Sequence, residues 1–205
     1  MIVRNKTWIA ILAVAVLLGP TASSAQQLFD FDGQANLPTT VGGTLSMVAV
    51  VLDGSPALET PLPLDFANFE YTIVVDGVTL DSESGDDRFY SGGTITLYED
   101  DATLADYADP ATFSDGTALL GGTFTVLNRT TLLSLVQVNG SVDWTGGSRI
   151  DDLAPADRVD WGFFASASAA AAVDGYDENW DGKVEPREPV VSTELQSFGG
   201  LKAAW

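Results

Sequence analysis

The residues with the most specific chemical spacing in this chain lie between positions 177 and 188. Oxygen-bearing side chains stand at the first, third and fifth positions, Gly182 at the sixth and a glutamate at the twelfth, as in the pattern D-x-[DN]-x-[DN]-G-x₅-E. Oxygens in this order suit a hard divalent cation, and the glycine permits a sharp turn. The candidate calcium ligands are Asp177, Asn179, Asp181, Lys183 through its backbone carbonyl, Glu185 through a water molecule, and Glu188.

This stretch resembles the calcium loops of EF-hand and dockerin proteins. The resemblance covers 12 of the 205 residues and implies calcium binding at those positions. Gly175 before the loop and Pro189 after it depart from the flanking helices of an EF-hand. A dockerin carries two such loops, whereas this chain has one. We therefore expect an isolated loop that calcium braces, and the alternative is an acidic, solvated turn without an ion.

Acidic residues dominate the rest of the chain as well. The segment 26–205 contains all 29 acidic residues and seven of the nine basic ones, which gives it a formal charge of −22. Such a charge attracts cations and repels nucleic acid and anionic membrane surfaces. It indicates either cation binding by several loops or a diffuse acidic surface suited to saline surroundings. The basic stripe of a nucleic-acid-binding protein is absent from the sequence.

The absence of cysteine and histidine removes many reactions from consideration. The chain has no thiol nucleophile, no zinc–thiolate ligand set and no imidazole base. Carboxylates alone could serve a glycosidase, but nothing marks one pair for that role. We therefore expect a protein that is not an enzyme.

The first 25 residues have the pattern of a signal peptide. Arg4 and Lys6 precede an apolar run over 8–18, and Ser23 and Ala25 supply the small residues of a cleavage site. We expect cleavage before Gln26 and a secreted or cell-surface protein. The apolar run is too short for a membrane span, which needs about 20 residues, and no later segment qualifies.

The elements that must position the acidic loop are short β-rich runs separated by Gly, Asp, Asn and Pro. We expect an all-β fold over 26–164, an antiparallel β-sandwich of immunoglobulin-like or jelly-roll type. Residues 165–205 are expected to form a small-residue linker, the calcium-like loop and a tail. The expected local features are hairpin turns at Asp76-Gly77 and Asn139-Gly140, a bulge at Gly121-Gly122, and short helical pieces at 104–107 and 165–173.

The runs Tyr98-Glu99-Asp100 and Phe113-Ser114-Asp115-Gly116-Thr117 are loosely similar to segments of exported bacterial β-sandwich proteins of unassigned function. We therefore expect a non-catalytic protein of the cell surface or extracellular matrix that binds calcium. One alternative is a carbohydrate-binding module, with Trp180 exposed and Trp144 and Trp161 in the core. The other is a filament subunit that associates with matrix proteins or with itself by strand addition.

Overall fold

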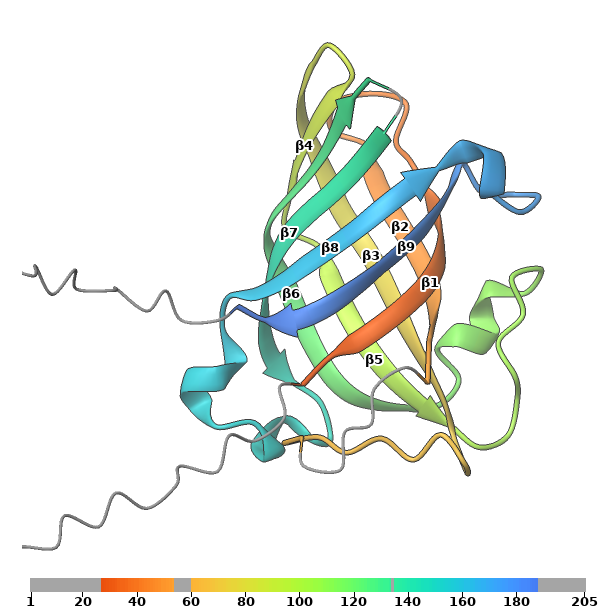
Figure 1. Ribbon diagram of the computed structural model, residues 1–205, viewed down its shortest axis with the longest axis vertical. Coiled ribbons are helices and arrows are strands. Elements are labelled where there is room, and N and C mark those ends of the chain that lie inside the picture. The colour runs from red at the N-terminus through yellow and green to blue at the C-terminus, as the bar shows by residue number, and fades with distance from the viewer. Residues whose placement is uncertain (1–26, 54–59, 134, 188–205) are drawn as a thin grey trace, which may run out of the picture.

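Nine strands form one antiparallel sheet in the computed structural model, which describes residues 27–53, 60–133 and 135–187 (Figure 1). The strands are β1 (Phe29–Asn36), β2 (Thr44–Val51), β3 (Glu70–Ser84), β4 (Asp87–Ser91), β5 (Thr94–Asp100), β6 (Thr117–Leu132), β7 (Leu135–Gly146), β8 (Trp161–Ser168) and β9 (Glu178–Pro186). The helices are four short 3₁₀ turns, η1 (Pro110–Phe113), η2 (Ile150–Asp152), η3 (Pro155–Arg158) and η4 (Ala169–Ala171). The predicted all-β, antiparallel fold is confirmed.

The sheet closes on itself. Its order is β2-β1-β9-β8-β7-β6-β4-β3-β5, and β2 also pairs with β3 while β5 also pairs with β6. Because β4 and β5 follow one another between β3 and β6, the nine strands fill eight positions of a barrel. The two facing sheets of the predicted sandwich are therefore not what the chain forms. Short strands in which apolar and polar residues alternate are compatible with a sandwich or a barrel, because both bury one face of every strand.

Large apolar side chains fill the barrel. Alternate residues of each strand point inward, so the period of two in the sequence becomes a lumen-facing stripe. The rings of Trp144 and Trp161 meet edge to face at 5.6 Å, and Phe29 stacks on Trp161 at 5.8 Å. Phe163 lies 6.2 Å from Trp180, deeper in the same lumen. The predicted core positions of Trp144 and Trp161 are confirmed, whereas Trp180 is fully buried and its predicted exposure is wrong.

Both predicted hairpin turns lie inside continuous strands. Gly77 has a φ of +69° but makes a bend within β3, and Asn139-Gly140 runs straight through β7. The connection between β6 and β7 instead follows Leu132, in a segment that contains no glycine, proline, asparagine or aspartate. The predicted bulge at Gly121-Gly122 is confirmed by a shift of register against β7.

The barrel has two distinct ends (Figure 1). The upper end carries the β3–β4 and β6–β7 hairpins and the loop that contains η4. The lower end carries the connections from β2 to β3, from β5 to β6 and from β7 to β8. Leu62 and Leu153, from two of those connections, are buried against the lower end of the core. None of the helices in the described residues has the length and apolar composition that a membrane crossing requires.

The stretch predicted to be a linker and tail supplies a central part of the sheet. β9 pairs with β1 from Phe29–Val184 to Ala35–Glu178, and with β8 from Trp161–Pro186 to Ser168–Asn179. It therefore joins the first strand of the chain to the eighth, and it spans both ends of the barrel. The small-residue run continues β8 as far as Ser168 and then forms η4 rather than a longer helix.

Candidate binding sites on the barrel

A pocket of about 480 Å³ opens at the lower end of the barrel. It lies between the end of β2, the segment that leads into β3, and the residues that follow β5. Its apolar lining includes Leu52, Phe66, Phe69, Tyr71 and Leu104. The rings of Phe66 and Tyr71 are 5.0 Å apart at an interplanar angle of 70°, and those of Phe69 and Tyr71 are 6.5 Å apart. Three aromatic rings thus form one side of the pocket.

Four carboxylates line the same pocket, and no lysine or arginine of the described residues does. They are Asp53, Glu70, Asp100 and Asp101. Glu70 accepts the backbone N–H of Ala105 at 2.6 Å, which ties the segment after β5 to the start of β3. Because four carboxylates and no cationic side chain line it, the pocket has a negative potential that falls off over about 8 Å at physiological salt.

Asp100 is held in its charged form by the backbone. Its carboxylate accepts the N–H groups of Ala102 at 2.9 Å and Thr103 at 3.1 Å, and these hydrogen bonds lower the pKa of Asp100. A carboxylate that caps a turn in this way loses freedom of rotation before any ligand arrives. Its position at the edge of the pocket is therefore fixed by the fold.

Tyr71 forms the part of the pocket nearest the core. Its hydroxyl donates to Oε2 of Glu99 at 2.8 Å and accepts the backbone N–H of Asp65 at 2.8 Å. Burial, with a smaller contribution from the neighbouring Glu99, outweighs the hydrogen bond from Asp65 and raises the pKa of Tyr71 to about 12. The hydroxyl of Tyr71 therefore stays neutral, and its ring packs against the ring of Phe66.

The predicted calcium ligands lie along a strand rather than around one point. Asp177 accepts the backbone N–H of Leu37 at 2.7 Å, and Asn179 donates to the carbonyl of Gly33 at 3.1 Å. Lys183 pairs with Oε1 of Glu185 at 2.7 Å. Because a strand rises by about 3.3 Å per residue, Asp177 and Glu185 are separated by roughly 26 Å. Asp181 is exposed on the same outer face, and Glu188 lies outside the described residues.

Gly182 also has a different role from the one predicted. Its φ is not positive, and a Cβ atom there would overlap the carbonyl oxygen of Phe164 on β8. The glycine thus permits two strands to approach closely, instead of permitting a turn. Within residues 27–53, 60–133 and 135–187, no three acidic side chains converge as a metal site requires. Calcium binding by the chain stays a prediction.

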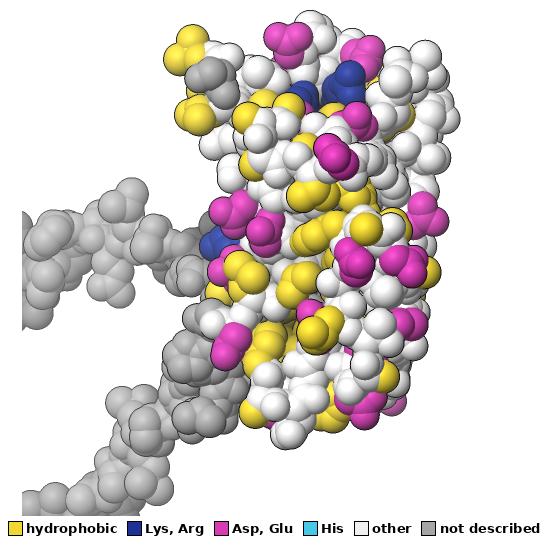
Figure 2. All heavy atoms as spheres, turned by 90° about the vertical axis from the view of Figure 1, so that its right-hand side faces the viewer, with side chains coloured by type: hydrophobic (Ala, Val, Ile, Leu, Met, Phe, Trp, Pro, Cys, Tyr) yellow, Lys and Arg dark blue, Asp and Glu magenta, His cyan; other side chains and the backbone are white. Residues whose placement is uncertain are grey.

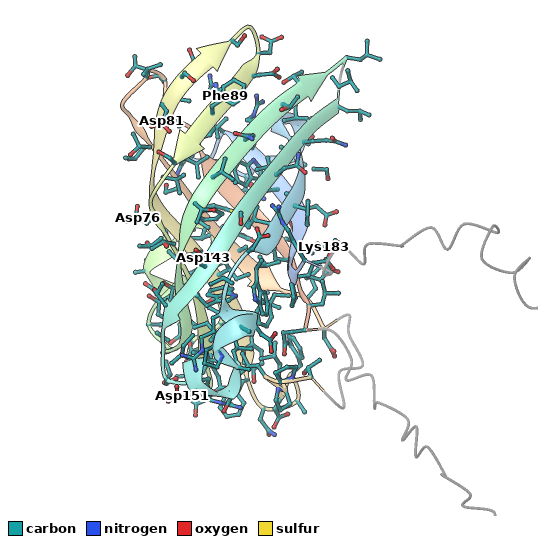
Figure 3. All side chains as sticks on the ribbon, turned by 90° about the vertical axis from the view of Figure 1, so that its left-hand side faces the viewer. Asp76, Asp81, Phe89, Asp143, Asp151 and Lys183 are labelled. Carbon is teal, nitrogen blue, oxygen red and sulfur yellow. The ribbon has the colours of Figure 1, made fainter. Side chains whose placement is uncertain are left out.

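A shallow groove of about 400 Å³ crosses the outer wall over part of this stretch. Cross-strand register places Asn139, Phe164, Lys183 and Asp30 in one row over β7, β8, β9 and β1. The ring of Phe164 lies over Gly162, where a Cβ atom would overlap it. The groove therefore combines one aromatic face with amide, ammonium and carboxylate groups. Figure 3 shows Lys183 on the outside of the barrel.

Inside the upper end, an ion pair crosses the lumen from β6 to β9. Arg129 donates through Nε to Oε2 of Glu178 at 3.1 Å and through Nη2 to Oε1. The indole N–H of Trp180 donates to the same carboxylate at 3.1 Å. Both charged side chains are largely buried. Tyr90 lies nearby with a buried hydroxyl that has no hydrogen-bond partner among the described residues, and burial raises the pKa of Tyr90.

Sequence reasoning recognised the acids of the lower pocket only in part. Asp100 was named only as part of the run Tyr98-Glu99-Asp100, and the acidic composition indicated either loops that bind cations or a diffuse acidic surface. The aromatic side was missed, although the run from Asp65 to Tyr71 alternates acidic or amide side chains with aromatic ones in a way that could have indicated it. Arg129 and Glu178 are 49 positions apart, and no local pattern connects them.

Fold and surface together define a closed, antiparallel β-barrel with a packed interior, an acidic aromatic pocket at one end and a polar groove on its wall. Comparison of the chain with protein-family models, curated proteins and solved structures finds no match.

Proposed function

We propose that this chain is an exported, non-catalytic binding protein of the cell surface or extracellular matrix, and that it binds an organic cation in the lower pocket. The observation that carries this proposal is the joint lining of the pocket by four carboxylates and three aromatic rings. An ammonium or guanidinium group gains from both, because aromatic faces attract cations and the carboxylates supply opposite charge. A basic side chain of a matrix protein has this chemistry.

The binding role is favoured over hydrolysis by the state of the pocket's acids. A glycosidase needs one carboxylic acid whose pKa is raised so that it can donate a proton. The shift at Asp100 is in the opposite direction, and backbone hydrogen bonds cause it. The packed lumen likewise supports surface binding, because the interior is filled by side chains such as Trp161 and Phe163.

Calorimetry with tetramethylammonium and with a hexalysine peptide tests the cation pocket. Asp53→Asn combined with Asp101→Asn removes two charges from the pocket and should weaken binding at least tenfold. Asp76→Asn combined with Asp81→Asn is the matched control, because it removes the same charge from β3, outside the pocket (Figure 3). We expect the control pair to weaken binding less than twofold.

Two outcomes of this calorimetry would defeat the proposal. One is an equal loss in the two double variants, which would indicate a general effect of net charge. The other is equal binding of neopentyl alcohol, a neutral molecule of similar shape to tetramethylammonium. The binding constant should also fall as salt is raised, since ions screen the pocket's charge.

Calcium belongs to the same proposal as a stabilising ion. The formal charge of −22 over 26–205 opposes the folded state by self-repulsion, and a divalent cation reduces that repulsion. Millimolar calcium should therefore raise the melting temperature. If Asp177→Ala with Asp181→Ala abolishes the gain, the ion binds at the predicted ligands. If the gain persists, the ion binds elsewhere on the acidic surface.

Export is tested directly by mass spectrometry of the protein released from its host. We expect the released chain to begin near Gln26. Retention of residues 1–25 in the released protein would contradict the signal-peptide prediction. These residues lie outside the described part of the chain.

Carbohydrate binding is a second candidate function, and the wall groove favours it. Phe164 presents a ring on the outer face, with Asn139 and Lys183 beside it in cross-strand register. Sugar hydroxyls pair with amide and charged groups, and sugar rings stack on aromatic faces. Asn139→Ala should then reduce retention on a glycan array, with Asn128→Ala, on β6 outside the groove, as the control. Equal retention of the two variants would exclude this groove.

Strand addition is the least favoured mode of self-association. It requires an open sheet edge with unpaired backbone groups. Every barrel strand in the described chain has a neighbour on both sides, so this sheet offers no such edge. If light scattering shows self-association at neutral pH, the contact must involve side-chain surfaces.

A further inference from the structure

Three leucines project from the tip of the β6–β7 hairpin. Leu133 is 96% exposed, and Leu132 and Leu135 are 67% and 66% exposed. In Figure 2 hydrophobic side chains stand out from the upper end of the molecule, at the corner where this hairpin turns. A single exposed leucine needs no explanation, but three at one convex tip form an apolar surface without a partner in the described chain.

The β6–β7 hairpin carries no charged side chain of its own near its tip. No charged residue occurs from 130 to 142, whereas 19% of the whole chain is charged. The neighbouring β3–β4 hairpin does carry charges, and Asp87 accepts the backbone N–H of Thr131 at 3.0 Å. Only the residues beyond Thr131 can therefore enter a medium of low dielectric constant without the penalty of burying an ion.

Backbone geometry provides a second, independent observation. Leu133 has a φ of +62°, in the left-handed region that glycine and asparagine occupy more easily. A leucine there strains the backbone, and at this exposure its side chain gains almost nothing from packing within the barrel. Neither packing within the barrel nor backbone preference accounts for a leucine at this position.

We infer that the β6–β7 tip inserts Leu132, Leu133 and Leu135 into the apolar layer of a zwitterionic lipid surface. A lipid surface fits a convex tip, because it adapts its shape, whereas a second copy of this chain offers at its lower end a pocket with a charged rim. Zwitterionic lipids are required, since the acidic barrel is repelled by anionic ones. Val41 and Val173 are further exposed apolar side chains, in the β1–β2 and β8–β9 connections of the same end.

The expected strength is that of a reversible anchor. Three leucines transferred from water give an affinity of the order of one myristoyl chain, about 10⁴ M⁻¹. This contact goes beyond cation binding, because it uses the opposite end of the barrel. It would hold an exported protein near a cell surface by its fold alone, as the chain has no cysteine for a lipid anchor.

The lack of cysteine also permits a site-specific test on the whole chain. Leu133→Cys is labelled with an environment-sensitive nitrobenzoxadiazole dye and mixed with phosphatidylcholine vesicles. The matched control is Val159→Cys, labelled in the same way, because Val159 is 56% exposed in the β7–β8 connection at the lower end and does not line the cation pocket. We expect a blue shift and a rise in emission at position 133 and no change at position 159. Insertion by any other segment would not produce this difference.

Sedimentation with the same vesicles gives the strength of the contact. Leu133→Asn should lower the partition constant at least tenfold, because one leucine is lost from the inserted surface. The tip is not a lipid anchor if the dye at position 133 is unchanged by vesicles in a protein with native circular dichroism. A shift that appears only with an added protein fraction would also overturn the proposal, in favour of a protein partner.

Discussion

The two ends of the barrel lumen are closed by different chemistry. At the lower end, Phe29, Trp144 and Trp161 pack ring against ring, and Leu62 and Leu153 cover them. At the upper end the lumen is closed by side chains of opposite charge, Arg129 and Glu178, with Trp180 as a third donor. The hydrophobic effect that drives the burial of these rings is non-directional, whereas a buried ion pair requires both partners in one geometry.

The ion pair and the aromatic cluster together fix the register of β9 in the barrel. Glu178 and Val184 lie on the same strand, at opposite ends of the lumen, so the ion pair and the aromatic cluster both depend on the alignment of β9. A shift of one residue would turn Glu178 to the outside and leave Arg129 buried without its partner. We therefore expect the ion pair to specify the fold more than it stabilises it.

The largest effect should follow from removing one partner at the upper end. Glu178→Ala leaves a buried guanidinium uncompensated and should destabilise the protein by about 3–5 kcal/mol, measured by chemical denaturation. Asp152→Ala, which breaks the exposed pair with Arg149 at the lower end, is the control and should lower stability by at most about 1 kcal/mol. Arg129→Met with Glu178→Leu should recover most of the loss. A double variant as unstable as Glu178→Ala would contradict this account.

A smaller effect is expected where β8 and β9 approach one another. Gly182→Ala places a Cβ against the carbonyl of Phe164, and separating the strands should cost about 1–3 kcal/mol. Thermal unfolding without calcium is the measurement. Gly146→Ala is the control, because Gly146 lies in a strand without a positive φ and a Cβ there meets open space. Suppose instead that Gly182→Ala changes calcium affinity but leaves stability in calcium-free buffer intact. Residues 177–188 would then form the predicted calcium loop, and the pairing of β9 with β8 would be contradicted.

The individual strands and their buried residues could be predicted from the sequence better than the closure of the sheet into a barrel. The strands and the burial of Trp144 follow from local alternation, which each segment carries by itself. Closure depends on the pairing of β1 with β9, whose residues are about 150 positions apart, and no local signal encodes it. At the calcium-like stretch two patterns overlap: oxygen ligands at alternate positions, and Glu178, Trp180 and Val184 between them, which are buried as in a strand.

Only the charged residues of the lower pocket could be recognised in the sequence. Asp100 and Asp101 stand out in the sequence because they are adjacent, but Asp53 joins them only through the fold. The same limit applies at the β6–β7 turn. Leu133 adopts a positive φ in a segment without glycine or asparagine, so tertiary pairing of the strands overrides the local preference for a turn elsewhere.

An intermediate effect on the pH dependence of stability is expected from a substitution at the lower end, in alkaline solution. The pKa of Tyr71 is raised to about 12 from an unfolded value near 10, so the folded state holds this proton more tightly. The resulting stabilisation is complete below pH 10 and is lost as the pH rises from 10 to 12. Tyr71→Phe should therefore reduce the decline of the melting temperature over this range. An identical decline in wild type and variant would place the alkaline transition at another tyrosine, such as Tyr107.

The smallest expected effect is a gain in the stability of the folded protein from a substitution at the upper end. Leu133→Asn removes a strained leucine from the left-handed region and should stabilise the protein by about 0.5–1 kcal/mol, or about 1–4 °C in melting temperature. Leu135→Asn is the control, because this exposed leucine has no positive φ and should change stability little. Because the same Leu133→Asn variant is expected to lose lipid binding, the two measurements should move in opposite directions. A variant that loses both stability and binding would show that the leucine serves the fold, and the difference between the two ends of the barrel would then lie only in their interiors.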